Sequence, residues 1–263
     1  MGINYIPLLH IFLLRKINSI NSMLEEKERR RPTFPNLTII IPALNEEEGI
    51  GATISEIKEV LNSFDFIVID GGSKDRTYEI AEEMGGKVIS QTGCGKGDAM
   101  SQALKHIDGN PDYIIFIDAD FTYPAKYLND MISLLQNNAD IGMVLGNRFD
   151  MRLKPKAMKN PYYAGNRILS LAQYFLNGVK LNDPLSGLRV IRWDVLKLWN
   201  PKSRGFDIEA ELNHYIERSG LKTVEIPISY RARLGKKKLG FKDGFSIFKR
   251  IISESISSRQ LFA

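Results

Sequence analysis

Short runs of β-branched residues alternate with longer amphipathic stretches along most of the chain, and this alternation limits the folds that it can adopt. Runs such as LTIIIP (37–42), FIVID (66–70) and YIIFID (113–118) are nearly continuous in apolar residues, which is typical of strands buried on both faces. The stretches between them repeat apolar residues at helical spacing. Strands and helices in this order predict a doubly wound α/β fold with a parallel sheet.

The remaining segments follow the same two patterns, although the alternation loosens after residue 150. Strands are expected at 37–42, 66–70, 87–90, 113–118, 141–146, 188–191 and 223–230. Helices are expected at 6–24, 46–61, 74–84, 95–107, 124–137, 160–177, 207–219 and 242–257. The Pro- and Lys-rich stretch 152–161 is predicted to be a mobile loop and not a domain boundary.

Composition and charge narrow the chemistry that the chain can carry. It has 263 residues and a single cysteine, Cys94, which excludes an intrachain disulfide and a cysteine-based zinc site. Three widely spaced histidines do not form a metal cluster, so carboxylates, arginines and the backbone must supply any chemistry. The net charge of +5 is uneven: residues 1–31 sum to +3, residues 230–263 to +7 and the middle to −5. Basic ends favour an anionic partner, such as a membrane surface, a nucleic acid or a phosphorylated substrate.

Polar clusters follow three of the expected strands. They are PALNEEE (42–48), DGGSKDRT (70–77) and DADFTYP (118–124). Ligands of open α/β sheets bind at the carboxyl ends of the strands, so the clusters predict a nucleotide site. Asp118 and Asp120 in the third cluster can hold one Mg²⁺ or Mn²⁺ and leave positions for diphosphate oxygens, or they can be a solvated turn.

Further polar residues suit a phosphorylated ligand. Asp70 can accept hydrogen bonds from a base or ribose, and Gly72 permits a tight turn after it. GCGKG (93–97) resembles a phosphate cradle without Walker spacing, and its Cys94 is interpreted as incidental. Arginines form a last set, whose guanidinium groups suit two separate phosphates: Arg148, Arg167, Arg189, Arg231 and Arg233.

Taken together, PALNEEE, VIDGGSKDRT, GKGDA, DADFTYP, GNRF, DPLSGLR and IPISYRAR resemble family 2 glycosyltransferases of the GT-A fold. The pattern is most similar to the dolichyl-phosphate hexose synthase group, in particular its archaeal members that serve protein N-glycosylation. The resemblance covers roughly residues 37–250 and implies a single α/β domain with a mostly parallel, Rossmann-like sheet. On this basis we divide the chain into an N-terminal amphipathic segment with a charged linker (1–36), the GT-A domain (37–235) and a basic amphipathic C-terminal segment (236–263).

The resemblance also implies roles for individual residues. The residues expected to bind the nucleotide sugar are Pro42, Asn45, Glu46, Asp70, Gly72, Lys96, Arg233 and Lys238. Asp118 and Asp120 are expected to bind Mg²⁺ or Mn²⁺ and, with Arg148, to form the catalytic set. Arg148 is expected to hold the acceptor phosphate, helped by Arg167 or Ser170. The implied reaction is attack of a dolichyl (polyprenyl) phosphate oxygen on the anomeric carbon, with loss of UDP and inversion.

The donor and the acceptor are less constrained than the reaction type. Phe121, Thr122 and Asn166 depart from the mannose synthase pattern, and the GKG string favours UDP-sugars, so glucose or N-acetylglucosamine is preferred. The alternatives are a dolichyl-phosphate mannose synthase that uses GDP-mannose and a soluble GT-A transferase with a small phosphorylated acceptor, as in glucosyl-3-phosphoglycerate synthases. A non-catalytic nucleotide-sugar-binding protein is a further alternative.

The ends of the chain are expected to contact the membrane that holds the lipid acceptor. In 241–256, apolar residues at helical spacing lie beside Lys249 and Arg250, which suits an in-plane interfacial helix, although the helix can equally pack on the domain's own core. No stretch reaches the ~18–20 apolar residues that span a bilayer. We therefore expect a peripheral protein on the cytoplasmic face of the membrane. Nucleic-acid binding is not expected, and a homo-oligomer is left open.

Overall fold

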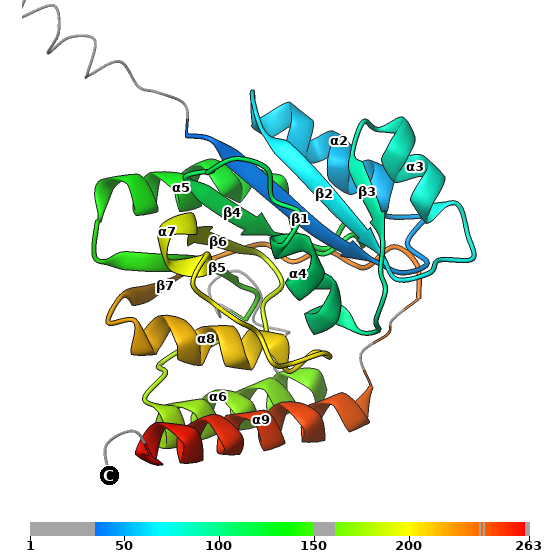
Figure 1. Cartoon of the computed structure of the whole chain (residues 1–263). Helices are drawn as coiled ribbons and strands as arrows, with labels where there is room; N and C mark the ends of the chain where they lie inside the picture. Colours follow the sequence, from blue (N-terminus) through cyan, green and yellow to red (C-terminus); the bar gives the residue numbers. More distant parts are fainter. Residues whose placement is uncertain (1–34, 150–160, 237, 239, 261–263) are drawn as a thin grey trace, which may run out of the picture. The chain divides into compact units, whose positions relative to one another are not determined.

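The central feature of the fold is a twisted sheet of seven strands in the order β3-β2-β1-β4-β6-β5-β7 (Figure 1). A computed structural model describes residues 35–149, 161–236, 238 and 240–260. The strands are β1 (Leu37–Ala43), β2 (Asp65–Asp70), β3 (Lys87–Ser90), β4 (Tyr113–Phe116), β5 (Ile141–Asn147), β6 (Arg189–Arg192) and β7 (Lys222–Pro227). All neighbouring pairs are parallel except those of β6, which runs antiparallel to β4 and β5. The prediction of an α/β fold with a mostly parallel sheet is confirmed.

Helices cover both faces of the sheet, and the central strands are accordingly buried at nearly every position. The helices are α2 (Ile50–Val60), α3 (Thr77–Glu83), α4 (Lys96–Leu104), η1 (Ala125–Tyr127), α5 (Leu128–Asn137), α6 (Pro161–Asn177), α7 (Trp193–Leu196), α8 (Ile208–Arg218) and α9 (Phe241–Gln260). Ile39 and Ile41 of β1 pack with α2 and α5, whereas Ile40 between them packs with α4 and α8. Burial of each such side chain stabilises the fold by about 1.5–3 kcal/mol.

A third layer lies outside α8. Helices α6 and α9 run side by side there, on the side of α8 that faces away from the sheet (Figure 1). Leu169 of α6, Ala210 of α8 and Ile247 and Ile251 of α9 form a small core between the three helices. The expected C-terminal helix is therefore present, and one of its faces packs on the domain.

The differences from the expected elements have local causes. The first helix begins at Ile50 and not at residue 46, because residues 46–49 form a turn in which Gly49 and Ile50 donate to the Glu46 carbonyl. Strand β6 runs antiparallel to β5 although helix α6 lies between the two strands in the chain. The expected helix 6–24, the linker after it and residues 152–160 of the expected loop lie outside the described residues.

Two features of the fold bear on function. The parallel strands β1, β2 and β4 direct their carboxyl ends to one edge of the sheet, so the loops after them meet there. In the part of the chain that the structure describes, no helix is both long and apolar enough to cross a membrane.

Candidate active site

The carboxylates of Asp118 and Asp120 lie just beyond the carboxyl end of β4, and each forms an ion pair with a basic side chain. Lys96 Nζ donates to Asp118 Oδ1 at 2.6 Å, and Arg233 Nη1 donates to Asp120 Oδ2 at 2.6 Å. Burial and the charge of Asp118 raise the pKa of Asp120. Burial also opposes ionisation of Asp118, but Lys96, Arg148 and Arg233 together outweigh it and lower the pKa of that carboxyl. The two predicted metal ligands therefore lie close enough to influence each other's protonation.

The turn that carries this pair has an unusual backbone conformation. Phe121 has a φ of +62°, in the left-handed region that disfavours residues with a side chain. Thr122 holds the turn, because its backbone N and its Oγ1 donate to Asp120 Oδ1 at 3.1 and 2.5 Å. The Arg231 guanidinium lies 3.7 Å from the centre of the Phe121 ring and pairs with Glu56 at 2.5 Å. Strain of this kind persists only where the surroundings fix it, and it is frequent at functional sites.

Lys96 connects the carboxylate pair to α8. Its Nζ contacts Glu209 Oε1 at 2.7 Å as well as Asp118. Burial would lower the pKa of Lys96, but the two carboxylates outweigh it and raise the pKa, so the lysine stays charged. Glu209 is 3% exposed, and its Oε2 is buried without a hydrogen bond from the described residues. The predicted phosphate-binding lysine is therefore present at the site, fixed from two sides.

The segment that follows β7 and carries Arg233 and Lys238, here called the strap, lies at the same edge of the sheet. Arg233 and Lys238 of the strap both donate to the carboxylate of Glu46, which is 6% exposed. Burial raises the pKa of Glu46, and the two cations counteract it. Glu46 thus contacts two other residues that are predicted to bind the nucleotide sugar, and Arg233 also contacts Asp120.

The loops after β1 and β2 form the wall next to this edge. Asp70 is 4% exposed, and its Oδ2 accepts from the backbone N of Gly72 and Ser73 at 3.0 Å each. Gly72 has a φ of +82°, so the predicted tight turn is confirmed. Asn45 fastens the two loops together, since its Oδ1 accepts from Lys74 N at 2.7 Å. Pro42 lies near the end of β1, in register with Ile69 of β2.

Arg148 directly follows β5, and Asp183 holds it. Its Nε and Nη2 donate to the two oxygens of the Asp183 carboxylate at 2.8 and 2.7 Å, and its backbone N donates to Oδ2 at 2.9 Å. Burial would lower the pKa of Arg148, but Asp183 outweighs it and raises the pKa. Arg148 lies close enough to Asp118 to help lower that carboxyl's pKa. Among the described residues, the Nη1 group of Arg148 makes no hydrogen bond.

The other two predicted acceptor ligands contact the loop that carries Asp183. Ser170 is 4% exposed, and its hydroxyl donates to the carbonyl of Leu181. Arg167 is exposed, and its Nη1 donates to Asn182 Oδ1 at 3.3 Å. Both residues hold this loop in the structure, and their contact with an acceptor phosphate stays a prediction.

The loop 183–189 connects the Arg148 side of the site to the carboxylate pair. Its first residue binds Arg148, and its Gly187 donates its backbone N–H to Tyr123 Oη at 2.7 Å. A Cβ at Gly187 would lie 2.3 Å from Asp118 Oδ2, so only glycine fits against that carboxylate. Tyr123 is buried and follows the strained turn at Phe121.

Comparison with known proteins identifies the family. The profile of the family described as "Glycosyl transferase family 2" matches residues 38–198, which include β2 to β6, all of β1 but its first residue, and the carboxylate pair. The chain belongs to glycosyltransferase family 2. It is therefore an enzyme that transfers a sugar, and the resemblance noted in its motifs is confirmed.

Relatives of this glycosyltransferase include two proteins of Haloferax volcanii. Glycosyltransferase AglJ is 34% identical over 88% of this chain and 76% of its own. A dolichyl-phosphate hexose transferase is 31% identical over 86% of this chain and 97% of its own. A solved structure of glucosyl-3-phosphoglycerate synthase from Mycobacterium tuberculosis, with Mn²⁺, UDP-glucose and phosphoglyceric acid, has a TM-score of 0.67 at 23% identity, over 85% of this chain and 79% of that one. At this identity the likeness shows the GT-A fold alone.

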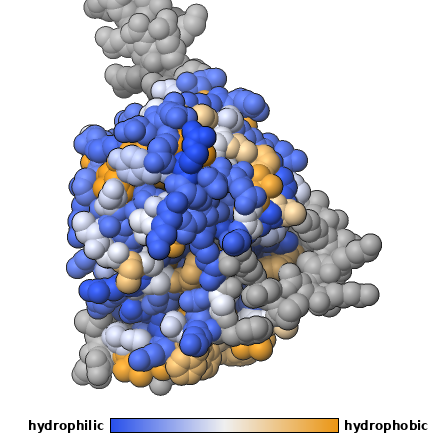
Figure 2. Space-filling model, turned by 90° about the vertical axis from the view of Figure 1, so that its right-hand side faces the viewer, coloured by the Kyte–Doolittle hydropathy of each residue, from blue (hydrophilic) through white to orange (hydrophobic). Residues whose placement is uncertain are grey.

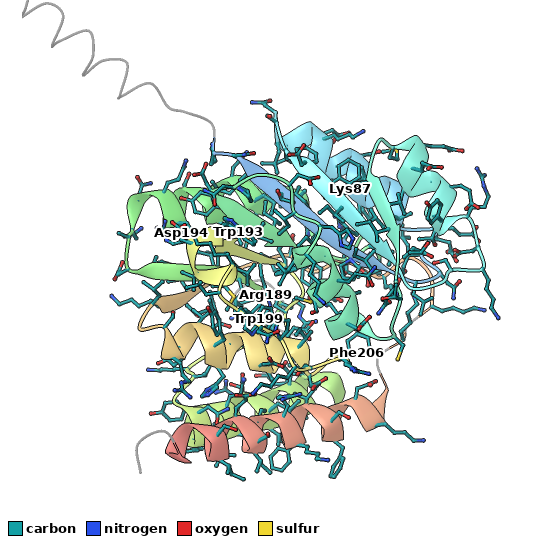
Figure 3. All side chains as sticks on the ribbon, in the orientation of Figure 1. Lys87, Arg189, Trp193, Asp194, Trp199 and Phe206 are labelled. Carbon is teal, nitrogen blue, oxygen red and sulfur yellow. The ribbon has the colours of Figure 1, made fainter. Side chains whose placement is uncertain are left out.

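Two arginines of this glycosyltransferase have internal partners. Arg189 is 1% exposed and lies in the interior above α8 (Figure 3). It donates to the carbonyls of Ser186 and Pro184 at 2.8 and 2.7 Å and to Asn213 Oδ1 at 2.6 Å, and burial lowers its pKa. Arg231 is bound to Glu56 as described above. The structure thus corrects the expectation that Arg189 serves a phosphate, because its guanidinium group is buried and holds parts of the fold. For Arg231, contact with a phosphate stays a prediction.

The sequence analysis did not identify three residues of the site: Asp183, Glu209 and Glu225. Asp183 stands in the DPLSGLR string, and Glu209 in GFDIE, but neither string indicates what its carboxylate contacts. Glu225 lies inside the expected strand 223–230 and not in a polar cluster after a strand. The sequence alone carries no signal that separates these three carboxylates from the others of the chain.

Proposed function

We propose that this glycosyltransferase moves a hexose, with glucose or N-acetylglucosamine favoured, from a UDP-sugar to dolichyl (polyprenyl) phosphate, and so supplies lipid-linked sugar for N-glycosylation. The observation that carries the proposal is the position of Arg148, which is fixed by Asp183 and close enough to Asp118 to affect its pKa. An anionic acceptor held there would lie next to the site for a nucleotide diphosphate. The Haloferax dolichyl-phosphate hexose transferase supports the acceptor, and the UDP-glucose of the mycobacterial neighbour supports the donor.

The carboxylate pair suits a divalent cation. In residues 35–149, 161–236, 238 and 240–260, no group of three or more His, Cys, Asp or Glu side chains that could hold a metal is present. Asp118 and Asp120 alone would therefore leave positions for phosphate oxygens and water, as Mg²⁺ and Mn²⁺ sites in nucleotide enzymes do. A metal on these two residues would neutralise charge on the leaving diphosphate. The Mn²⁺ in the mycobacterial neighbour supports this assignment.

The protein's own residues would then position two anions that repel each other. A phosphate acceptor is ionised at neutral pH, so it needs no strong general base, and the task of the site is orientation and charge screening. Arg148 would hold the acceptor phosphate through the guanidinium edge that Asp183 leaves free. Lys96, Arg233 and Lys238 would face the donor diphosphate from the other side. Displacement in line between the two would invert the anomeric centre.

An apolar surface on the third layer supports contact with a membrane. Large side chains of α6 and α9 are exposed on the outer side of these helices: Ile168, Leu171, Tyr174, Phe175, Phe245, Phe248, Ile252 and Ile256. Figure 2 shows hydrophobic residues along the lower end of the molecule, where Figure 1 places α9. Lys242 and Lys249 are exposed on the same helix. An apolar face with basic neighbours is typical of helices that lie in a membrane interface.

Replacing Phe175 and Phe245 by serine together is expected to reduce binding to anionic lipid vesicles by about tenfold or more, because each ring contributes about 1.5–3 kcal/mol when it leaves water. These two side chains are 76% and 74% exposed, so the fold should not change. Cosedimentation with vesicles measures the effect. Leu198→Ser is the matched control, since Leu198 is 75% exposed but follows α7, away from the third layer. Equal binding by the double variant and the wild type would disprove the contact.

The proposed reaction is tested by transfer of radiolabel into the organic phase. Purified protein is mixed with Mn²⁺ or Mg²⁺, dolichyl phosphate and one labelled donor: UDP-glucose, UDP-N-acetylglucosamine or GDP-mannose. Transfer from a UDP-sugar, abolished by EDTA and restored by the metal, is the expected result. Transfer only from GDP-mannose would change the donor, and transfer only to 3-phosphoglycerate would replace the lipid acceptor by a small phosphorylated one.

A further inference from the structure

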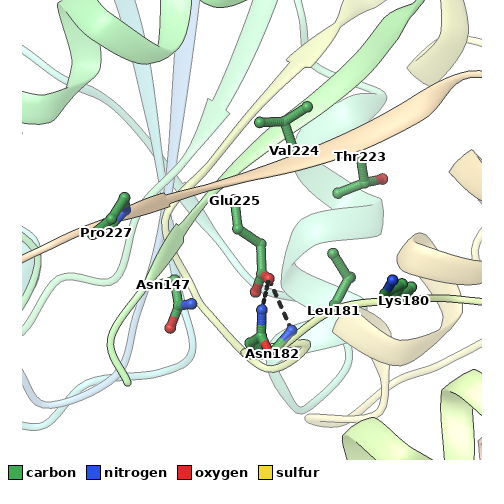
Figure 4. Close-up of a pocket in the computed structure, with 8 residues that line it drawn as sticks. All are labelled: Asn147, Lys180, Leu181, Asn182, Thr223, Val224, Glu225 and Pro227. Carbon is green, nitrogen blue, oxygen red and sulfur yellow. Dashed lines mark hydrogen bonds between the residues drawn. The ribbon is translucent and has the colours of Figure 1, made fainter. Parts of the chain in front are cut away.

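Glu225 of β7 binds the amide side of the loop that carries Asp183. Its Oε1 accepts from Asp183 N at 2.7 Å, and its Oε2 accepts from the backbone N and the Nδ2 of Asn182 at 2.9 and 2.8 Å. Figure 4 shows the Glu225 side chain extending from the strand toward Asn182. Both carboxylate oxygens are thus used to fix two consecutive residues, although neither residue belongs to a helix or strand.

Asp183, whose backbone N–H binds Glu225, binds Arg148 with its side-chain carboxylate. The Asp183 carboxylate is 0% exposed and accepts three hydrogen bonds from Arg148. Asp183 therefore receives Arg148 on its carboxylate while its backbone N–H is held by Glu225. Glu225 is thus connected to the Arg148 guanidinium, which would receive the acceptor phosphate, through Asp183: Glu225 binds its backbone N–H, and its carboxylate binds Arg148.

The two ends of this connection are carried by neighbouring strands. β5 and β7 are parallel and in register, with Leu145 opposite Glu225, and Arg148 comes one residue after the end of β5. Within the part of the chain that the structure describes, the backbone N–H groups of Asn182 and Asp183 are bound by Glu225 alone. On its carbonyl side the loop is held by α6, where Ser170 binds the Leu181 carbonyl and Asn166 Nδ2 binds the Asn182 carbonyl at 3.2 Å. Removing Glu225 would thus free one side of the loop and leave the other in place.

Electrostatics exclude a direct role for Glu225 in attracting a phosphate. Its carboxylate lies close enough to that of Asp183 for the two charges to interact, and a second negative charge would repel a phosphate. Burial raises the pKa of Glu225 and the charge of Asp183 raises it further, whereas the bonds from Asn182 and Asp183 N–H groups lower it. Glu225 and Lys180 both line a surface hollow that also includes Asn182 (Figure 4). A half-buried carboxylate whose hydrogen bonds all go to one loop acts through the geometry that it imposes on its donors.

We propose that Glu225 is a positioning residue for the acceptor phosphate: it fixes the loop at 182–183, so that Asp183 presents the free edge of Arg148 in one orientation. The proposal rests on the proposed function, because it assigns the acceptor phosphate to Arg148. It predicts that Glu225 affects the acceptor and not the donor.

Glu225→Ala is expected to raise the KM for polyprenyl phosphate by about tenfold or more and to leave the KM for the UDP-sugar within about twofold, since small displacements of a positioning group are costly. Initial rates at varied acceptor and saturating donor, and the reverse, measure both constants. Thr223→Val is the matched control, because Thr223 lies on the same strand and lines the same hollow. Equal increases in both KM values would overturn the proposal.

A double variant separates positioning from a general loss of stability. If Glu225 acts through Arg148, its substitution should change the acceptor KM by less than about twofold in an Arg148→Lys background. Additive effects would indicate a purely structural role and reject the proposal. Amide hydrogen exchange at residues 181–186, expected to be faster in Glu225→Ala, gives a readout without any substrate. Unchanged exchange rejects the proposal, whereas a wild type that transfers nothing to polyprenyl phosphate rejects the proposed function instead.

Discussion

Asp120→Asn is expected to lower kcat for sugar transfer by about 10³-fold, because it removes half of the charge that a divalent cation needs at this site. Asparagine has the same size and can still accept from Thr122, which contacts Asp120 Oδ1 in the wild type. The substitution therefore changes the charge and keeps the turn. Label transfer measures the loss, and titration with Mn²⁺ by calorimetry should show binding weaker by about tenfold or more.

The stability of this variant provides a second check. The pKa of Asp120 is raised by burial and by the charge of Asp118, so the ionised carboxylate destabilises the fold at neutral pH. A neutral side chain there should leave the free energy of unfolding at pH 7 unchanged or higher, measured by urea denaturation. Asp108→Asn is the control, because the Asp108 side chain is 84% exposed and pairs with Lys87 on the surface. Wild-type turnover and Mn²⁺ affinity in Asp120→Asn would refute the metal assignment.

Gly187→Ala is expected to lower kcat by about 100-fold, the effect of displacing a catalytic group by about 1 Å. A methyl group there would lie 2.3 Å from Asp118 Oδ2 and 2.6 Å from its Cγ. Asp118 cannot turn aside without leaving Lys96, which Glu209 also holds. The loop or the carboxylate must therefore move, and steady-state rates with both substrates varied would detect either shift.

The control for Gly187→Ala is Gly244→Ala. A Cβ at Gly244 would have no atom within 4 Å, so this variant should keep full activity. Circular dichroism would show whether both variants are folded. A folded Gly187→Ala protein with wild-type rates would mean that Asp118 needs no fixed position.

The part of the site around Asp70, Asp118 and Asp120 was predictable because these residues directly follow buried strands. Asp70, Asp118 and Asp120 each come at the end of a run whose periodicity identifies a strand, and parallel strands bring their carboxyl ends together. Lys96 was found for a similar reason, since it begins a helix after a glycine-rich turn. Local sequence is sufficient where the next element in the chain is also the neighbour in space.

The contacts among Arg148, Asp183 and Glu225 were not predictable because they depend on how distant segments of the chain meet. Asp183 lies 35 residues after Arg148, and Glu225 lies 42 residues after Asp183. The strand β6, which follows the Asp183 loop, enters the sheet antiparallel to β5, and nothing in the sequence indicates that direction. Arg189 shows the same limit, because an arginine in a short strand can face solvent or, as here, the interior.

The loop 183–189 has a thermodynamic consequence for how the two substrates bind. Its one end fixes Arg148 and its other end lies against Asp118, and Arg189 ties its carbonyls to the interior. A stiff segment between two binding sites makes their occupancies interdependent, since a displacement at one end is transmitted to the other. Whatever factor the donor imposes on the affinity for the acceptor, the acceptor imposes on the affinity for the donor. The enzyme would thus show cooperativity between unlike ligands within one small domain.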